Sequence, residues 1–206
     1  SYEGTSVTEA VNDNENGKVK VTVAGEIGTY GAGSIDVNMY NEAGELKDTK
    51  TVTAWNTTSN TVEFEPEASG TYYFEAVAKR TGVAKTYASS KYKSEGYMLP
   101  LKAAVLQLRT AEQSKIEVTW DAVPEADSYE VSYSTDGTTY SEAVTATDTK
   151  QLLSGLTVGT EYTFKVVAVR NNPATKKEAI VKGTATADEI RKWGSVTYGN
   201  GHEDGK

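Results

Sequence analysis

The sequence contains no cysteine and only one histidine, and both absences narrow the chemistry available to the chain. Without cysteine there is no disulfide, no thiolate metal site and no thiol nucleophile. The single histidine, His202, lies in a glycine-rich terminal stretch, and no Ser sits in a Gly-x-Ser-x-Gly motif, so a catalytic triad cannot be assembled. We therefore expect no enzymatic activity and no cofactor in this chain.

The chain also lacks an excess of positive charge and any long apolar run. Its net charge of −8 disfavours nucleic acids and anionic membrane surfaces as partners. No apolar stretch approaches the roughly 18 residues that a membrane-spanning helix needs. The sequence opens on Ser1-Tyr2-Glu3 without the pattern of a signal peptide, so we expect that the chain was either trimmed or is cytoplasmic. Helical periodicity is almost absent, while Thr, Ser, Val and Tyr dominate, which favours β-strands.

What the sequence does contain is an internal repeat. Residues 70–80 are echoed by residues 159–170 once one inserted residue, Glu161, is allowed for. Tyr72 then matches Tyr162, and Phe74 matches Phe164, both at an offset of 90 residues. Further upstream, residues 34–39 match 128–133 at an offset of 94, and residues 18–23 match 115–120 at an offset of 97. The changes in offset are expected in loops, which tolerate insertions.

The repeat predicts an all-β fold of two tandem sandwich domains of about 90 residues each. We expect the first domain over 1–95 and the second over 97–187, with the Leu99-Pro100 dipeptide close to their boundary. Residues 188–206 belong to neither copy and form a tail or the start of a further domain. In that stretch we expect the large apolar side chain of Trp193 to be packed against something.

The second copy resembles a fibronectin type III domain. The residues that carry the resemblance are Trp120, Pro124, the alternating strand Tyr129, Val131 and Tyr133, Leu156 six residues before Tyr162, and the alternating strand Tyr162, Phe164, Val166 and Ala168. The resemblance implies that Trp120 fills the centre of the core. It also implies that Tyr162 is a tyrosine corner whose hydroxyl group ties back to the backbone near Leu156.

The first copy departs from this pattern. Val23 takes the place of Trp120, and Pro66 stands where a leucine would precede Tyr72 by six residues. We expect a sandwich with a different core residue, with Trp55 as the candidate. An immunoglobulin-like sandwich of other topology is the alternative for this half. If the repeat holds, Tyr72 and Tyr162 occupy equivalent places.

Candidate binding residues are few. Asp13 and Glu15 lie in a polar turn and are weak candidates for calcium, but the full spacing of a calcium loop is missing, and turn chemistry explains them equally well. Six tyrosines are candidates for a sugar-stacking surface, although ordinary strand surface would use them too. They are Tyr30, Tyr40, Tyr87, Tyr92, Tyr97 and Tyr140.

The hairpin at residues 134–140 is similar to those in fibronectin type III modules of bacterial extracellular glycan-processing and surface proteins. The resemblance implies non-catalytic spacer, presentation or protein-interaction modules of a secreted or cell-surface bacterial protein. The alternative is an accessory carbohydrate-binding region. The expected partner is a protein or a polysaccharide, and we expect a monomer.

Overall fold

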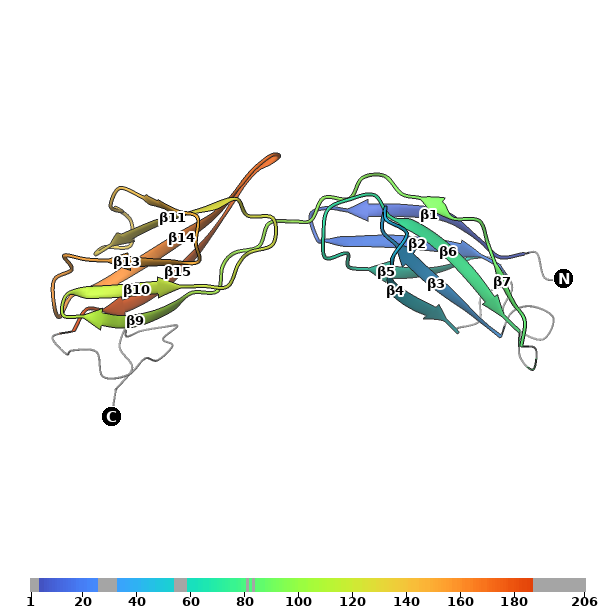
Figure 1. Ribbon diagram of the computed structural model, residues 1–206, viewed down its shortest axis with the longest axis horizontal. Helices are drawn as coiled ribbons and strands as arrows, with labels where there is room; N and C mark the ends of the chain where they lie inside the picture. Colours follow the sequence, from blue (N-terminus) through green and yellow to red (C-terminus); the bar gives the residue numbers. More distant parts are fainter. Residues whose placement is uncertain (1–3, 26–32, 54–58, 81, 83, 187–206) are drawn as a thin grey trace. The chain divides into compact units, whose positions relative to one another are not determined.

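The computed structural model describes residues 4–25, 33–53, 59–80, 82 and 84–186, which form strands and turns but no helix. No helix in these ranges is therefore available to cross a membrane. The chain divides into two compact units, residues 1–100 and 101–206, here called unit 1 and unit 2 (Figure 1). The predicted all-β fold of two sandwiches is confirmed. The finer limits of 1–95 and 97–187 remain predictions, and residues 188–206 lie outside the described ranges.

Unit 1 is built from two antiparallel sheets. One has the strand order β1-β2-β5, and the other has the order β4-β3-β6-β7 with β8 also paired to β6. The strands are β1 (Ser6–Asp13), β2 (Lys18–Ala24), β3 (Ser34–Tyr40), β4 (Leu46–Val52), β5 (Asn60–Phe64), β6 (Tyr73–Lys79), β7 (Thr86–Ala88) and β8 (Tyr92–Lys93).

Unit 2 repeats this order. Its smaller sheet is β13-β10-β9 and its larger sheet is β12-β11-β14-β15. The strands are β9 (Gln107–Glu112), β10 (Lys115–Thr119), β11 (Ser128–Ser134), β12 (Val144–Ala146), β13 (Lys150–Leu153), β14 (Glu161–Asn171) and β15 (Ala174–Thr184).

The strand register confirms the sequence repeat. In unit 1, Ser34 pairs with Lys79, and in unit 2, Ser128 pairs with Val169. These partners are related by the offsets of 94 and 90 residues found in the sequence. Unit 1 therefore has the same strand order as unit 2, and the alternative of a different sandwich topology for this half is wrong.

Alternation along the strands places the core between the two sheets, because successive side chains in a strand point to opposite faces. In β2, every second residue from Val19 to Val23 is fully buried, and β3 and β6 show the same alternation. The core of unit 1 contains the ring pair Phe64 and Phe74, with centroids 5.4 Å apart. Trp55, the predicted core residue, lies outside the described residues.

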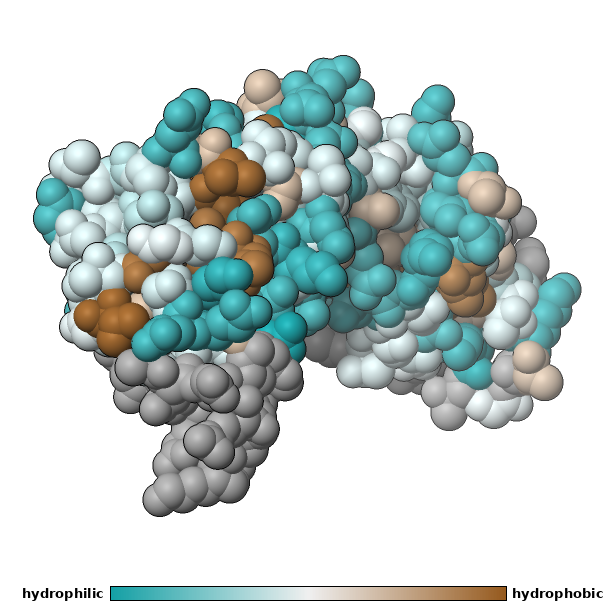
Figure 2. Space-filling model, turned by 60° about the vertical axis from the view of Figure 1, so that its left-hand side comes forward, coloured by the Kyte–Doolittle hydropathy of each residue, from teal (hydrophilic) through white to brown (hydrophobic). Residues whose placement is uncertain are grey.

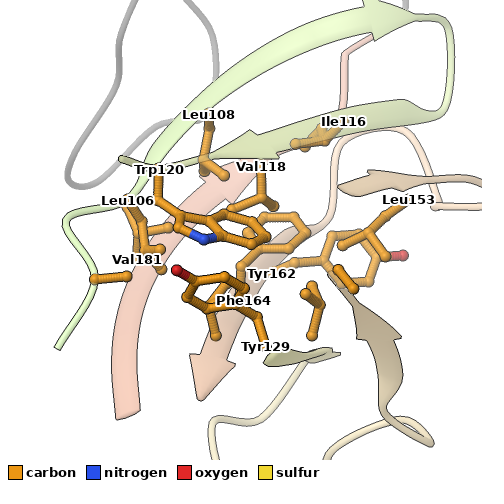
Figure 3. Packing of buried hydrophobic residues seen from close by; sticks show 14 of the residues in the cluster. Leu106, Leu108, Ile116, Val118, Trp120, Tyr129, Leu153, Tyr162, Phe164 and Val181 are labelled. Atoms are coloured by element: carbon orange, nitrogen blue, oxygen red, sulfur yellow. The ribbon is translucent and has the colours of Figure 1, made fainter. Parts of the chain in front are cut away.

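The core of unit 2 is centred on aromatic residues from both sheets (Figure 3). Trp120, 5% exposed, packs edge-to-face on Tyr129 with ring centroids 5.1 Å apart. Figure 3 shows Leu108 and Val118 beside the indole ring. Such aromatic pairs contribute more than the apolar area they bury.

Both units carry a buried tyrosine just before or at the start of the long central strand. The Tyr162 hydroxyl group accepts a hydrogen bond from the Thr157 amide at 2.7 Å. The Tyr72 hydroxyl group donates to the carbonyl oxygen of Ala68 at 2.6 Å. The two rings are 5% and 6% exposed, so Tyr72 and Tyr162 occupy equivalent places.

Two of the predicted turns use glycine in the left-handed region. Gly17 has φ 71° and Gly137 has φ 77°. A Cβ atom at Gly17 would also lie 3.2 Å from the Pro100 ring, so the turn between β1 and β2 requires glycine for both conformation and space.

Candidate interaction surface

The outer face of the larger sheet in unit 1 carries mostly polar side chains. Ile35, Val37 and Met39 point into the core, so their neighbours along β3 point outward. The outward residues of β3, β4 and β6 include two apolar ones, Val77 and Leu46, and the following polar ones: Asp36, Asn38, Tyr40, Thr49, Thr51, Tyr73, Glu75 and Lys79. We call this set the polar face.

Glu75 is the centre of the hydrogen bonds on the polar face. Its Oε1 atom accepts from Asn38 Nδ2 at 3.1 Å and from the Tyr40 hydroxyl group at 2.9 Å. Thr49 Oγ1 in turn donates to Asn38 Oδ1 at 2.8 Å. The bond to Glu75 raises the pKa of Tyr40, which keeps this hydroxyl group protonated. Because three strands contribute, the side chains are held in place before any partner binds.

A second group on the polar face is an ion pair. Lys79 Nζ contacts Asp36 Oδ2, and Thr51 Oγ1 donates to Asp36 Oδ1 at 2.8 Å. Partial burial acts to raise the pKa of Asp36, but the bonds from Lys79 and Thr51 outweigh it, so the pKa lies below its ordinary value. Asp36 therefore stays ionised at neutral pH.

Two half-buried candidate tyrosines, Tyr40 and Tyr140, each have one ring face covered by a lysine. Lys91 Nζ lies 4.0 Å from the Tyr40 ring centroid, and Lys165 Nζ lies 3.8 Å from that of Tyr140. These are cation–π contacts. Burial, followed by the charges of Glu178 and Asp136, raises the pKa of Tyr140. Neither ring offers both faces to a sugar.

The remaining candidate tyrosines do not form an exposed stacking surface within the described residues. Tyr87 and Tyr92 pack against the core of unit 1 as partly buried residues. The expectation that Tyr97 is exposed is wrong: it is 2% exposed and packs edge-to-face on Tyr72, with ring centroids 6.3 Å apart. It is drawn inward because its backbone bridges to Gly70. Tyr30 lies outside the described residues.

The turn between β1 and β2 explains Asp13 without a metal ion. Asp13 accepts from the Asn16 amide at 3.1 Å and from Asn16 Nδ2 at 2.9 Å. The side-chain bond from Asn16, followed by its backbone bond, lowers the pKa of Asp13. Glu15 is exposed in the same turn. Within the described ranges, no three Asp, Glu or His side chains gather as metal ligands.

Sequence reasoning missed two arrangements. Tyr73 lies opposite Tyr40 on the polar face, a placement that follows from strand pairing and not from any local motif. The second is Arg170, 7% exposed, whose guanidinium group contacts Glu125 at 3.2 Å. Beside it, the Asn171 amide donates to Asp127 at 2.6 Å. This bond ties the hairpin between β14 and β15 to the loop between β10 and β11. The sequence signal for Arg170 is that it matches Arg80 at the offset of 90 residues in the repeat.

Exposed apolar side chains in unit 2 are scattered over several elements. They include Val105, Val144, Leu152, Val158 and Ile180. On the face of unit 2 seen in Figure 2, hydrophobic areas alternate with hydrophilic ones. Singly exposed apolar residues are ordinary on protein surfaces and do not by themselves mark a site.

Comparison with known proteins relates the chain to one domain family. Residues 110–179 match a family profile described as a PBP1-like, fibronectin3-like domain. Over 94 residues, 43% of this chain, the sequence is 30% identical to a titin homolog of Caenorhabditis elegans, and the match covers 0% of that protein's length to the nearest percent.

Two solved structures of chicken proteins align with most of the chain. A two-domain fibronectin type III segment of tenascin is 16% identical, with 86% of this chain and 97% of that chain covered and a TM-score of 0.42. The FN1–FN3 domains of CNTN1 are also 16% identical, with 86% and 66% covered and a TM-score of 0.32. The family profile lies within unit 2, and unit 1 has the same strand order and the same register of its central strands. Over residues 110–179, unit 2 is therefore similar to a fibronectin type III-like domain.

Proposed function

We propose that the two domains are spacer and protein-interaction modules of a secreted or surface-attached bacterial protein. Domains of this type are generally non-catalytic, commonly mediate protein interactions and are typical of extracellular proteins. The bacterial context is supported by the hairpin at residues 134–140, which resembles those of bacterial extracellular modules. Fold alone does not assign the task, so the proposal depends on a specific surface.

The observation that supports an interaction role is the polar face of unit 1. Its hydrogen bonds join Asn38, Tyr40 and Glu75 across two neighbouring strands. An arrangement that is ordered in advance loses less conformational freedom when a partner binds. A flat sheet face with fixed donors and acceptors suits a protein surface of matching polarity.

A domain replacement in the protein that contains this chain tests the proposal. If unit 1 is only a spacer, an unrelated fibronectin type III domain of equal length restores the activity that deletion removes. If the polar face binds a partner, the replacement fails and Glu75→Ala reproduces that failure. Glu63→Ala, on the other sheet, is the matched control and should have no effect. Unchanged activity after deletion of unit 1 would contradict both roles.

The extracellular location is tested separately. In a bacterium producing the parent protein, intact cells should expose unit 1 and unit 2 to an added protease and to antibodies. Protection until the cells are lysed would contradict a surface location, and absence from the culture medium as well would contradict secretion.

Polysaccharide binding is a second candidate, supported by the position of Tyr73 opposite Tyr40 beside Asn38 and Glu75. Affinity electrophoresis in gels containing soluble polysaccharides tests it. Retardation that Tyr73→Ala removes and Tyr87→Ala retains would support this candidate. Equal mobility with and without every polysaccharide would contradict it.

A further inference from the structure

β15 is a long edge strand at the end of the larger sheet in unit 2. Its 11 residues pair along one side with β14, and no strand among the described residues pairs with its other side. A free edge presents a row of backbone N–H and C=O groups that can pair with another strand. Many proteins prevent this by interrupting the edge or charging it.

The side chains of β15 are arranged symmetrically about Ile180. Val181 points into the core at 3% exposure, so Ile180 and the residues two positions away on either side point outward. Ile180 is 48% exposed, with Glu178 on one side along the strand and Lys182 on the other. The charges flanking the isoleucine therefore have opposite signs.

We propose that two copies of the chain associate through β15, paired antiparallel with Ile180 on the two-fold axis. In this register Ile180 meets Ile180 of the second copy. Glu178 of each copy lies opposite Lys182 of the other, which gives two identical ion pairs. A two-fold contact of this kind uses the same patch on both subunits. The two larger sheets become one continuous sheet.

Several neighbouring registers are disfavoured by charge. Centring the pair on Ala179 sets Lys176 against Lys182 of the other copy. Centring it on Glu178 or on Lys177 sets each of these residues against itself. Like charges directly opposite each other destabilise a sheet, whereas opposite charges stabilise it. Centring the pair on Val181 opposes no like charges, but it sets Glu178 against Thr184 and forms no ion pair. Among these registers, only the one centred on Ile180 forms two ion pairs without opposing like charges.

This inference does not depend on the function proposed above, and it differs from the monomer expected from the sequence. An edge contact buries little area, so the dimer should be weak and should form only at high protein concentration. Sedimentation velocity over a concentration series measures it directly. The wild-type chain should shift toward twice its mass as the concentration rises, and a constant monomer mass up to millimolar concentration would overturn the proposal.

Charge reversal tests the register. Glu178→Lys alone and Lys182→Glu alone each place like charges together twice, so each variant should remain monomeric. Mixed in equal amounts, the two variants should associate with each other, because every pair then has opposite charges. The double variant should also regain self-association. Failure of the mixture to associate when the wild type dimerises would overturn the Ile180 register.

A control separates this contact from a general charge effect. Lys93→Glu reverses a charge on β8, the last strand of unit 1, and should leave the dimer unchanged. Loss of the dimer in this variant as strongly as in Glu178→Lys would overturn the proposal. The altered side chains of β15 are exposed, so unfolding in urea should be unchanged, which confirms that the variants are folded.

Discussion

Units 1 and 2 share one strand order but differ in their last strand and in the residues of their cores. Their strand orders and the register of their central strands coincide, but the last strand does not. In unit 2 it is the continuous β15, while in unit 1 it is divided into β7 and β8. At the break, Ser89 uses its side chain as well as its backbone: its Oγ atom accepts from the Ala76 amide at 3.0 Å. A short, interrupted edge is protected from pairing, so of the two last strands only β15 keeps a long edge open.

The cores differ in where the aromatic rings lie. In the core of unit 2, Trp120 packs on Tyr129, whereas the positions matched by the repeat in unit 1 hold Val23 and Ile35. Unit 1 instead gains Tyr97, contributed by the segment that follows β8. One strand order therefore tolerates large changes in individual core residues when ring volume is supplied from elsewhere.

The largest effect is expected from removing the central ring of unit 2. Trp120→Ala should lower the stability of unit 2 by about 3–5 kcal/mol, because it opens a cavity in a small core. Hydrogen exchange of β14 amides measures this unit separately from unit 1. Val23→Ala, at the matched position, is the comparison and should cost less. A loss below about 1 kcal/mol for Trp120→Ala would show that the indole ring does not support the core.

The tyrosine corners should differ in their response to loss of the hydroxyl group. Tyr162→Phe leaves the Thr157 amide without its partner, which should cost about 1–3 kcal/mol. Tyr72→Phe removes a donor to the Ala68 carbonyl group, which retains a second lone pair for water, so about 0.5–1.5 kcal/mol is expected. Chemical denaturation followed by hydrogen exchange resolves the two units. Equal losses would contradict the difference in hydrogen-bond direction.

The divided edge of unit 1 offers a smaller test. Ser89→Ala removes the acceptor of the Ala76 amide and should cost about 1 kcal/mol in unit 1. Exchange of the Ala76 amide should accelerate while unit 2 is unaffected. Ser90→Ala is a suitable control, since the Ser90 contact in the structure uses its backbone carbonyl group. Unchanged exchange at Ala76 would show that this side-chain bond does not close the edge.

Much of this fold can be predicted from the sequence because the repeat preserves alternation. The alternation of Val19, Val21 and Val23 predicts the inward face of a strand. The offset of 90 residues between Tyr72 and Tyr162 predicts that the two tyrosines occupy equivalent positions. Such signals are local and survive in a single sequence. The resemblance to a fibronectin type III domain then supplies the order of the strands.

The candidate surface could not be predicted in the same way. Glu75 and Asn38 are 37 residues apart in sequence and meet only through the pairing of β3 with β6. Tyr97 was a candidate for a sugar-stacking surface, whereas its backbone bridge to Gly70 holds it at the core. The role of a side chain outside a periodic strand is set by distant partners, which the sequence does not display.

The smallest expected effect is the change in stability at low pH, which should differ between the turns that follow β3 and β11. In unit 2, the Asp136 carboxylate accepts from the amides of Thr139 and Thr138 at 2.7 and 2.8 Å, and these bonds hold its pKa far below the ordinary value. The corresponding turn in unit 1 is closed by the neutral Asn41 amide group, which accepts from the Glu45 amide. A depressed folded-state pKa contributes stability above the unfolded pKa, and this contribution is lost as pH falls through the folded pKa.

The stability gap between wild type and Asp136→Asn should therefore be constant from pH 7 to about pH 5 and should narrow below about pH 4. The difference in stability between wild type and Asn41→Ala in unit 1 should not show this change with pH, because the Asn41 side chain has no carboxyl group to titrate. NMR titration of the Asp136 carboxyl carbon provides the direct measurement. A midpoint at the ordinary value of an aspartate would contradict the hydrogen-bonded hairpin, and the acid response would no longer distinguish the two units.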